Sequence, residues 1–375
     1  MEFKINQSDL KTALNAVSGA LMKGKAVGIL ECVYIESLGE RRIRITATDF
    51  DLTIKAEADA EIIQGGSVCV EGFKLTEVTR NLPNLEMTFA QESNHWMRVT
   101  AGRSKYRLAG RVGTDYPELA SSKNPPVTIN RDVLRSMIRS TVFTAAQDTP
   151  QWNINGVYFE STGEDFRAVA TDGLRVALAT AIALDGEPFE FLLSKRGASE
   201  VSKLESTEIQ ASFDANHIFF DADGVQLTVR KSTGKFPAYR VMMPKDEGRE
   251  IASFNIAEMK AALKRAGVMS DADLSTVRLE IAKGEIAIRS QSREEGEADE
   301  FITAEYDGPE QVLGVRWTHL LQFLETITDG GDALISFKPD SVELFKFTPK
   351  GSDDQQYFLV PVQLNVQEKQ LKKAA

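Results

Sequence analysis

Alternation of apolar and polar residues is the clearest pattern in this chain, and it occurs twice in nearly the same form. Residues 33–49 and residues 156–172 each contain two alternating runs separated by a short polar segment. Such alternation predicts two β-strands joined by a turn. Each stretch ends in Thr-Asp, at Asp49 and at Asp172, which are 123 positions apart. One supersecondary unit is therefore present twice.

A second pattern, a short strand followed by an apolar stripe at helical spacing, marks the start of three copies. It begins near Ile5, Ile129 and Ile256, at successive spacings of 124 and 127 residues. Polar residues stand at the strand–helix junctions, and Asn130 is a candidate N-cap. The chain is therefore predicted to consist of three copies, each about a third of its length.

Each copy also contains a second short helix midway along it, predicted over residues 73–81, 194–204 and 316–327. The remaining segments are strand-like, about eight in each copy. This pattern predicts an α+β fold, in which two helices pack on antiparallel sheets in every copy. We expect the copies at residues 1–122, 127–246 and 250–364, and a polar, disordered tail at residues 365–375.

Composition narrows the class of protein without deciding its function. The 375 residues carry a net charge of −11, which taken alone argues against nucleic-acid binding, although charges sorted by face could still leave a basic surface. The chain has no apolar run long enough to cross a bilayer and no export signal at its start. Cys32 and Cys69 stand among apolar or small residues, so we expect free thiols and a cytoplasmic protein.

Residues able to perform catalysis are scattered. The three histidines lack metal-ligand spacing, and no phosphate-binding glycine loop of the Walker type is present. Asp329-Gly330-Gly331-Asp332 resembles a fragment of a calcium loop without its other ligands, and it is better interpreted as a turn. Asp49, Asp51 and Asp172 are interpreted as turn aspartates, with a metal-dependent nuclease as the alternative. We expect no metal and no cofactor.

Three motifs, in this order and spacing, resemble one family over residues 1–364. They are Gly102-Arg103-Ser104-Lys105-Tyr106, Ala170-Thr171-Asp172-Gly173-Leu174-Arg175 and Gly234-Lys235-Phe236-Pro237-Ala238-Tyr239-Arg240. The chain is similar to the bacterial sliding clamps, the β subunits of DNA polymerase III. The resemblance implies a head-to-tail homodimer whose six domains form a ring around duplex DNA. It also implies a processivity factor without catalytic activity, or a clamp-like paralogue with altered partners.

The resemblance implies a pocket between the second and third copies for peptides like Gln-x-x-Leu-Phe. Such peptides would belong to the DNA polymerase III α subunit, the clamp-loader δ subunit, and other polymerases and repair proteins. Leu174, Val241 and Gln363 differ from residues common in the family and are expected to shift the preferred peptide. The pocket residues carried over by motif are Ile154, Thr171, Gly173, Leu174, Arg175, Val176, Pro237, Met242, Val342, Leu344, Phe358, Val360, Pro361 and Val362.

The resemblance also implies that the helices face DNA and that an edge strand forms the dimer interface. Mobile basic side chains on a smooth wall attract phosphates without reading bases, which suits sliding. The DNA-facing candidates are Lys23, Lys25, Lys74, Arg80, Gln151, Lys195 and Arg196, of which Gln151 stands where familiar members are basic. Residues 103–108 alternate like an edge strand, which must be covered or used. The interface candidates are Arg103, Lys105, Tyr106, Leu108, Val268, Met269, Glu294 and Glu297.

Overall fold

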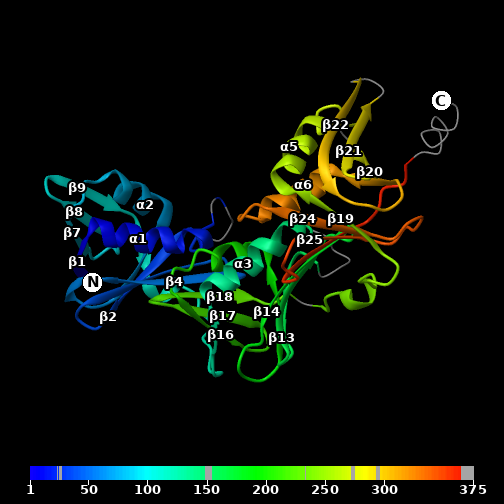
Figure 1. The fold of residues 1–375 in the computed structure, drawn as a ribbon. Helices are drawn as coiled ribbons and strands as arrows, with labels where there is room; N and C mark the ends of the chain where they lie inside the picture. Colours follow the sequence, from blue (N-terminus) through cyan, green and yellow to red (C-terminus); the bar gives the residue numbers. More distant parts are fainter. Residues whose placement is uncertain are drawn as a thin grey trace. The chain divides into compact units, whose positions relative to one another are not determined.

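The computed structural model describes residues 1–22, 24, 28–147, 154–232, 234–271, 275–292 and 296–364. The fold is α+β, with short helices on antiparallel sheets (Figure 1). It contains two compact units, one made of residues 1–134 and 196–232, the other of residues 135–195 and the chain from residue 233. No helix among the described residues is long and apolar enough to span a membrane.

The first copy contains two helices, as predicted, and ten strands. Its elements are β1 (Glu2–Asn6), α1 (Gln7–Val17), β2 (Cys32–Leu38), β3 (Arg42–Thr48), β4 (Leu52–Asp59), β5 (Glu61–Gln64), β6 (Ser67–Glu71), α2 (Gly72–Asn81), β7 (Glu86–Gln91), β8 (Met97–Ala101), β9 (Ser104–Leu108) and β10 (Gly110–Val112). Short 3-10 turns follow at Ser18–Ala20 and Gly113–Asp115. The two strands beyond the predicted eight, β5 and β10, pair with β1 and β6 respectively.

The second and third copies each contain eight strands. The second consists of β11 (Val127–Asn130), α3 (Arg131–Thr141), β12 (Gly156–Ser161), β13 (Asp165–Thr171), β14 (Arg175–Ile182), β15 (Phe189–Ser194), α4 (Lys195–Val201), β16 (Glu208–Phe213), β17 (His217–Ala222) and β18 (Val225–Arg230), with 3-10 turns at Val142–Thr144 and Tyr239–Met242. The third consists of β19 (Glu250–Asn255), α5 (Ile256–Gly267), β20 (Thr276–Ala282), β21 (Glu285–Ser292), β22 (Gly296–Glu305), β23 (Gln311–Arg316), α6 (Trp317–Thr326), β24 (Asp332–Phe337), β25 (Phe345–Pro349) and β26 (Gln355–Leu359).

Strand pairing joins successive copies into continuous sheets. In the first unit, a nine-stranded sheet has the order β10-β6-β2-β3-β4-β18-β17-β16-β11, so β4 of the first copy pairs with β18 of the second. A separate five-stranded sheet has the order β5-β1-β7-β8-β9. In the second unit, a twelve-stranded sheet contains the same kind of junction, where β14 pairs with β26. Each junction is antiparallel.

Asparagine caps start two of the three leading helices, as the pattern at the strand–helix junctions predicts. The side chain of Asn130 accepts hydrogen bonds from the backbone N–H groups of Asp132 and Val133, and Asn255 does the same for Ala257 and Glu258. Asn6 is the exception, because it makes no capping bond with its side chain.

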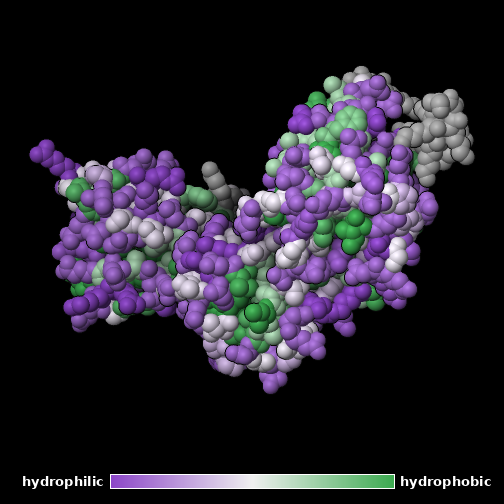
Figure 2. Space-filling model, in the orientation of Figure 1, coloured by the Kyte–Doolittle hydropathy of each residue, from purple (hydrophilic) through white to green (hydrophobic). Residues whose placement is uncertain are grey.

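Aromatic packing under the helices defines the core of the second unit. Phe323 of α6 stacks on Tyr357 of β26, with ring centroids 4.8 Å apart. Both rings belong to one buried cluster that also includes the apolar faces of α5 and β19–β25. The surface in view is mostly hydrophilic, with apolar side chains gathered in small patches (Figure 2). Docking surfaces must therefore be sought among a limited set of exposed apolar residues.

Candidate peptide pocket, helical wall and dimer edges

The turn between β13 and β14 is held by its own side chains. The Thr171 hydroxyl donates to the Arg175 carbonyl at 2.6 Å and accepts from the Gly173 N–H at 3.1 Å. The Asp172 carboxylate accepts from the Leu174 N–H at 3.0 Å. Gly173 has φ of +89°, a left-handed conformation that favours glycine. This network leaves the Leu174 side chain exposed at the tip of the turn.

Arg175 is a buried anchor for this turn. Its guanidinium donates to Asp172 Oδ2 at 2.8 Å, to Gln322 Oε1 of α6 at 2.6 Å and to the Phe143 carbonyl at 3.2 Å. The side chain is only 8% exposed, so these internal partners surround it. Burial, followed by the neighbouring Arg175 charge, lowers the pKa of His319 on α6 to about 4. Arg175 thus fixes the turn to the third copy.

Four exposed apolar side chains come from the segments that the resemblance assigns to the peptide pocket. Leu174 is 46% exposed, Met242 43%, Val342 78% and Val360 38%. The Val360 N–H donates to the Leu174 carbonyl at 3.0 Å, which extends the β14–β26 pairing beyond the last strand. Single exposed aliphatic residues are ordinary on a protein surface, so the interest of these four lies in their position on the predicted pocket segments.

Most other predicted pocket residues belong to the floor or the backbone of this region. Val176 and Phe358 lie in a small buried cluster with Val169, Leu178 and Tyr239, and Leu344 packs against it. Ile154 is also buried, while Pro237, Pro361 and Val362 are half-buried and Gly173 is exposed. The Val362 N–H donates to the Gly314 carbonyl at 2.9 Å, which fixes the strand exit.

The sequence reasoning missed the polar support behind the Tyr239-Arg240 pair. The Tyr239 hydroxyl donates to the Glu160 carboxylate, and Arg240 Nη1 donates to the same group at 3.2 Å. Val241, directly after the pair, is 84% exposed. The signal in the sequence was a single carboxylate, Glu160, in the mostly apolar segment that forms β12.

The predicted DNA-facing residues have different settings. Lys74 and Arg80 are exposed on α2, and Lys74 pairs with Glu77 at 3.0 Å. Lys195 is half-buried at the start of α4, whereas Arg196 donates to Asp49 and to the Gly19 carbonyl. Lys23, Lys25 and Gln151 lie outside the described residues.

Two strand edges of opposite charge stand out, one in each unit. Among the described residues, β9 pairs only with β8, and β22 pairs with β21 along residues 296–303 without a strand on its other side. Arg103, Lys105 and Arg107 lie on or beside the first edge, with Tyr106 37% exposed and Leu108 half-buried. The second edge carries the exposed side chains of Glu297, Asp299 and Phe301.

The remaining predicted interface residues are Val268, Met269 and Glu294. Val268, after α5, is 67% exposed and Met269 is half-buried. Glu294 lies outside the described residues. Phe301 is 52% exposed, with Arg289 5.8 Å from its ring centroid, and sequence reasoning did not identify it. Its signal was an apolar residue at an outward position of an otherwise acidic strand.

Comparison with protein families accounts for nearly the whole chain in three consecutive pieces. Residues 1–120, 128–238 and 240–363 match the N-terminal, central and C-terminal domains of the DNA polymerase III beta subunit. The chain belongs to this family. It is therefore a sliding clamp, a non-catalytic processivity subunit, in agreement with the resemblance seen in the sequence.

Individual sliding clamps agree with this assignment. The beta sliding clamp of Pseudomonas putida is 25% identical over 97% of this chain and 100% of its own, and that of Escherichia coli is 24% identical with the same coverage. Among solved structures, a Pseudomonas aeruginosa clamp has a TM-score of 0.91 at 24% identity, covering 97% of this chain and 100% of its own. The Bacillus subtilis clamp has a TM-score of 0.91 at 22% identity, with the same coverage.

The aspartates that could have supported an enzyme have structural partners in this clamp. Asp49 accepts from Arg196 and from the backbone N–H groups of residues 51 and 52, and Asp172 accepts from Arg175. No group of three or more His, Cys, Asp or Glu side chains among the described residues could hold a metal ion. Cys32 and Cys69 are free and buried.

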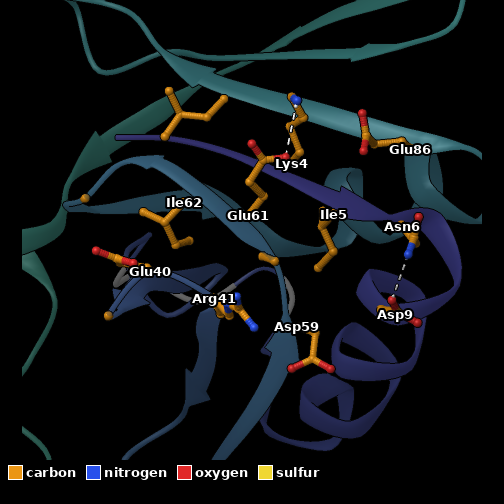
Figure 3. Close-up of a pocket in the computed structure, with 14 residues that line it drawn as sticks. Lys4, Ile5, Asn6, Asp9, Glu40, Arg41, Asp59, Glu61, Ile62 and Glu86 are labelled. Carbon is orange, nitrogen blue, oxygen red and sulfur yellow. Dashed lines mark hydrogen bonds and ion pairs between the residues drawn. The ribbon is translucent and has the colours of Figure 1, made fainter.

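One cavity of the first unit involves none of the predicted site residues. It measures about 930 Å³ and lies beside β1 and β5 and the turn after β2 (Figure 3). Lys4 pairs with Glu61 at 3.3 Å across it, and Asn6 donates to Asp9 at 3.3 Å at the helix start. Some of the carboxylates that line this cavity, such as those of Glu61 and Asp9, therefore already have partners within the protein.

Proposed function

We propose that this clamp tethers partner proteins through the exposed apolar residues around the Thr171–Arg175 turn. The observation that carries the proposal is the exposure of Leu174, Met242, Val342 and Val360 above a buried apolar floor. A short peptide with leucine and aromatic anchors buries such a surface efficiently. In this mechanism Arg175 supports the turn from inside the protein and does not bind the peptide itself, because internal acceptors already occupy its donors. Backbone groups of the clamp at the exit of β26 orient the bound peptide.

The partners expected for the pocket are those named by the resemblance. They are the DNA polymerase III α subunit, the clamp-loader δ subunit, and other polymerases and repair proteins with a Gln-x-x-Leu-Phe-like segment. From the same resemblance we expect this protein in the bacterial cytoplasm, associated with the nucleoid. Leu174, Val241 and Gln363, all exposed, then bias which peptide binds best.

Titration of a fluorescent peptide containing Gln-x-x-Leu-Phe tests the pocket. We expect saturable binding to the wild-type chain and at least a tenfold loss for Met242→Asp or Val360→Asp, because a charge would replace an apolar anchor site. Ile182→Asp is the matched control, since Ile182 is 91% exposed at the other end of β14. Equal weakening by all three variants, or wild-type binding that neither pocket variant affects, would contradict the assignment.

The proposed assembly is a head-to-tail homodimer that closes around duplex DNA. Edge β9 of one chain would pair with edge β22 of its partner, which satisfies both edges and joins Arg103 and Lys105 to Glu297 and Asp299. By two-fold symmetry the contact occurs twice and forms a ring. An edge with unpaired backbone groups and complementary charge supports this arrangement.

Retention on DNA tests the ring and the basic helices separately. A clamp loaded onto closed circular duplex should remain bound in high salt and leave once the circle is cut, because retention is topological. Lys74→Glu and Arg80→Glu should instead lower the weak, salt-sensitive affinity for linear duplex without abolishing retention on circles. Retention that is equal on linear and circular DNA would contradict the ring.

A further inference from the structure

The first copy contains a row of side chains in register with the floor of the proposed peptide pocket. Directly opposed pairs run Tyr34, Thr46, Lys55, Gln226 across β2, β3, β4 and β18. The same pairing across β12, β13, β14 and β26 runs Tyr158, Val169, Leu178, Gln356. Directly opposed residues share one face of a sheet. The two rows are therefore equivalent positions of two copies.

A pair of stacked aromatic rings also accompanies each of the two rows. Tyr34 stacks on Tyr116 with ring centroids 5.1 Å apart, and Tyr158 stacks on Phe236 at 4.9 Å. In the second copy, the middle of the row is apolar and buried, with Val169 and Leu178 packed beside Tyr239. In the first copy, Thr46 and Lys55 occupy those positions. The first copy therefore has polar residues at the positions where the second copy has buried apolar ones.

This substitution is accompanied by a cavity. A space of about 330 Å³ lies over the first row, and its lining includes Tyr34, Glu36, Thr46, Lys55, Tyr116 and Leu119. That volume is near the lower limit of small-molecule sites, so it suits a ligand with a single ring. The walls are aromatic, and the Tyr116 hydroxyl is turned away to donate to the Thr46 carbonyl at 3.3 Å.

Lys55 is the cationic side chain that lines this cavity, and it has no partner within ion-pair distance among the described residues. Glu36, which also lines the cavity, is already engaged, since Arg44 Nη1 lies 3.5 Å from its carboxylate and the Tyr34 hydroxyl donates to it at 3.5 Å. Arg44 is in turn paired with Glu57 at 2.9 Å. Burial and then the Arg44 charge lower the pKa of Lys55, while Glu36 acts in the opposite direction. A half-buried ammonium without a close counter-charge favours an anionic ligand.

We propose that this cavity, defined by Tyr34, Thr46, Lys55 and Tyr116, binds a small aryl carboxylate. The ring lies against the tyrosine wall, and the carboxylate receives a charge-assisted hydrogen bond from Lys55 Nζ. The site is separate from the peptide pocket and does not depend on it. The repeat has thus produced two recognition surfaces of different chemistry, one apolar and one cationic.

Calorimetric titration of the full chain with 4-hydroxyphenylacetate tests the proposal. We expect saturable one-to-one binding per chain, with 4-hydroxyphenylethanol, which lacks the carboxylate, binding at least tenfold more weakly. Lys55→Leu, which copies Leu178 of the second copy, should weaken acid binding at least tenfold. Lys11→Leu is the matched control on α1, where the lysine is exposed, and should bind as the wild type does. The peptide affinity of every variant should remain unchanged.

A second measurement covers the case in which Lys55→Leu fails to fold. Reductive ¹³C-methylation of the wild-type chain preserves lysine charge and gives each lysine an NMR signal. The Lys55 signal should shift on addition of the acid and not of the alcohol. No saturable acid binding at millimolar concentration, equal binding of the two probes, or a shift shared by Lys11 would overturn the proposal, whatever the peptide titration shows.

Discussion

The Arg196 guanidinium donates a hydrogen bond to the Asp49 carboxylate, whose side chain is only 3% exposed. It also donates to the Gly19 carbonyl. Arg175 makes the equivalent pair of contacts in the second copy, to Asp172 and to the Phe143 carbonyl. In both the first and the second copy a guanidinium thus lies between the turn aspartate and a 3-10 carbonyl, but Arg196 comes from α4 of the second copy and Arg175 from β14.

Replacement of Arg196 by methionine should destabilise the first unit. The change leaves a buried carboxylate that retains only its backbone donors, so we expect the free energy of unfolding to fall by about 1–3 kcal/mol. Urea unfolding followed by far-UV circular dichroism measures the loss. Lys195→Met, at the adjacent position, should stay within about 0.5 kcal/mol of the wild type. Equal effects of the two substitutions would contradict a structural role for Arg196.

Arg175→Met should have a larger effect than Arg196→Met. Its side chain is 8% exposed and three acceptors surround it, so the loss should be about 3–5 kcal/mol. Hydrogen exchange should show loosening of both the 171–175 turn and α6. Gln322→Ala removes only one of the acceptors and should cost less. If Arg175→Met weakened peptide binding while exchange in α6 stayed unchanged, the arginine would contact the peptide directly.

A charge placed on either dimer edge should dissociate the assembly. Tyr106→Glu or Phe301→Glu would bury a carboxylate in the proposed interface, and we expect the dimer dissociation constant to rise by about a hundredfold or more. Sedimentation equilibrium measures the change. Phe50→Glu is the control, because Phe50 is 54% exposed in the β3–β4 turn and belongs to neither edge strand. A dimer unaffected by both edge variants would exclude these strands.

Acid should weaken the second unit through His319. Its pKa is lowered to about 4, so in the window from about 4 to 6.5 the unfolded chain binds the proton that the folded chain excludes. Stability from this group is complete above pH 6.5 and is lost as pH falls towards 4. His319→Gln should reduce the loss between pH 7 and pH 5 by about 1–2 kcal/mol, allowing for a half-buried ring. A loss between pH 7 and pH 5 as large in His319→Gln as in the wild type would contradict this role of His319.

Local patterns predicted the elements of the fold well. The alternating runs at residues 33–49 and 156–172 are strand pairs, and Asn130 and Asn255 cap helices as side chains at strand–helix junctions do. The predicted helix at residues 194–204 is shorter, ending at Val201, and the N–H groups of Lys203 and Leu204 bond to carbonyls only three residues back. These features depend on neighbouring residues, which is why sequence alone reveals them.

Contacts between residues far apart in the sequence were harder to predict. The junction strands β14 and β26 are separated by more than 170 residues, and nothing local in either strand specifies the other. Arg175 was identified as a pocket residue from its motif, but its burial depends on Gln322 and Phe143, which no pattern connects to it. Phe301 likewise became notable only when β22 proved to have a free edge.

The β14–β26 junction has a consequence for folding of the protein during its synthesis. β26 supplies the partner of β14, which precedes it by more than 170 residues, with Arg175 opposite Leu359. On a ribosome adding about 5–20 residues per second, β14 therefore waits roughly ten to forty seconds for that partner. During this interval its backbone offers an open edge to other nascent chains. The nascent clamp is therefore exposed to misassembly throughout this interval, until β26 has been made.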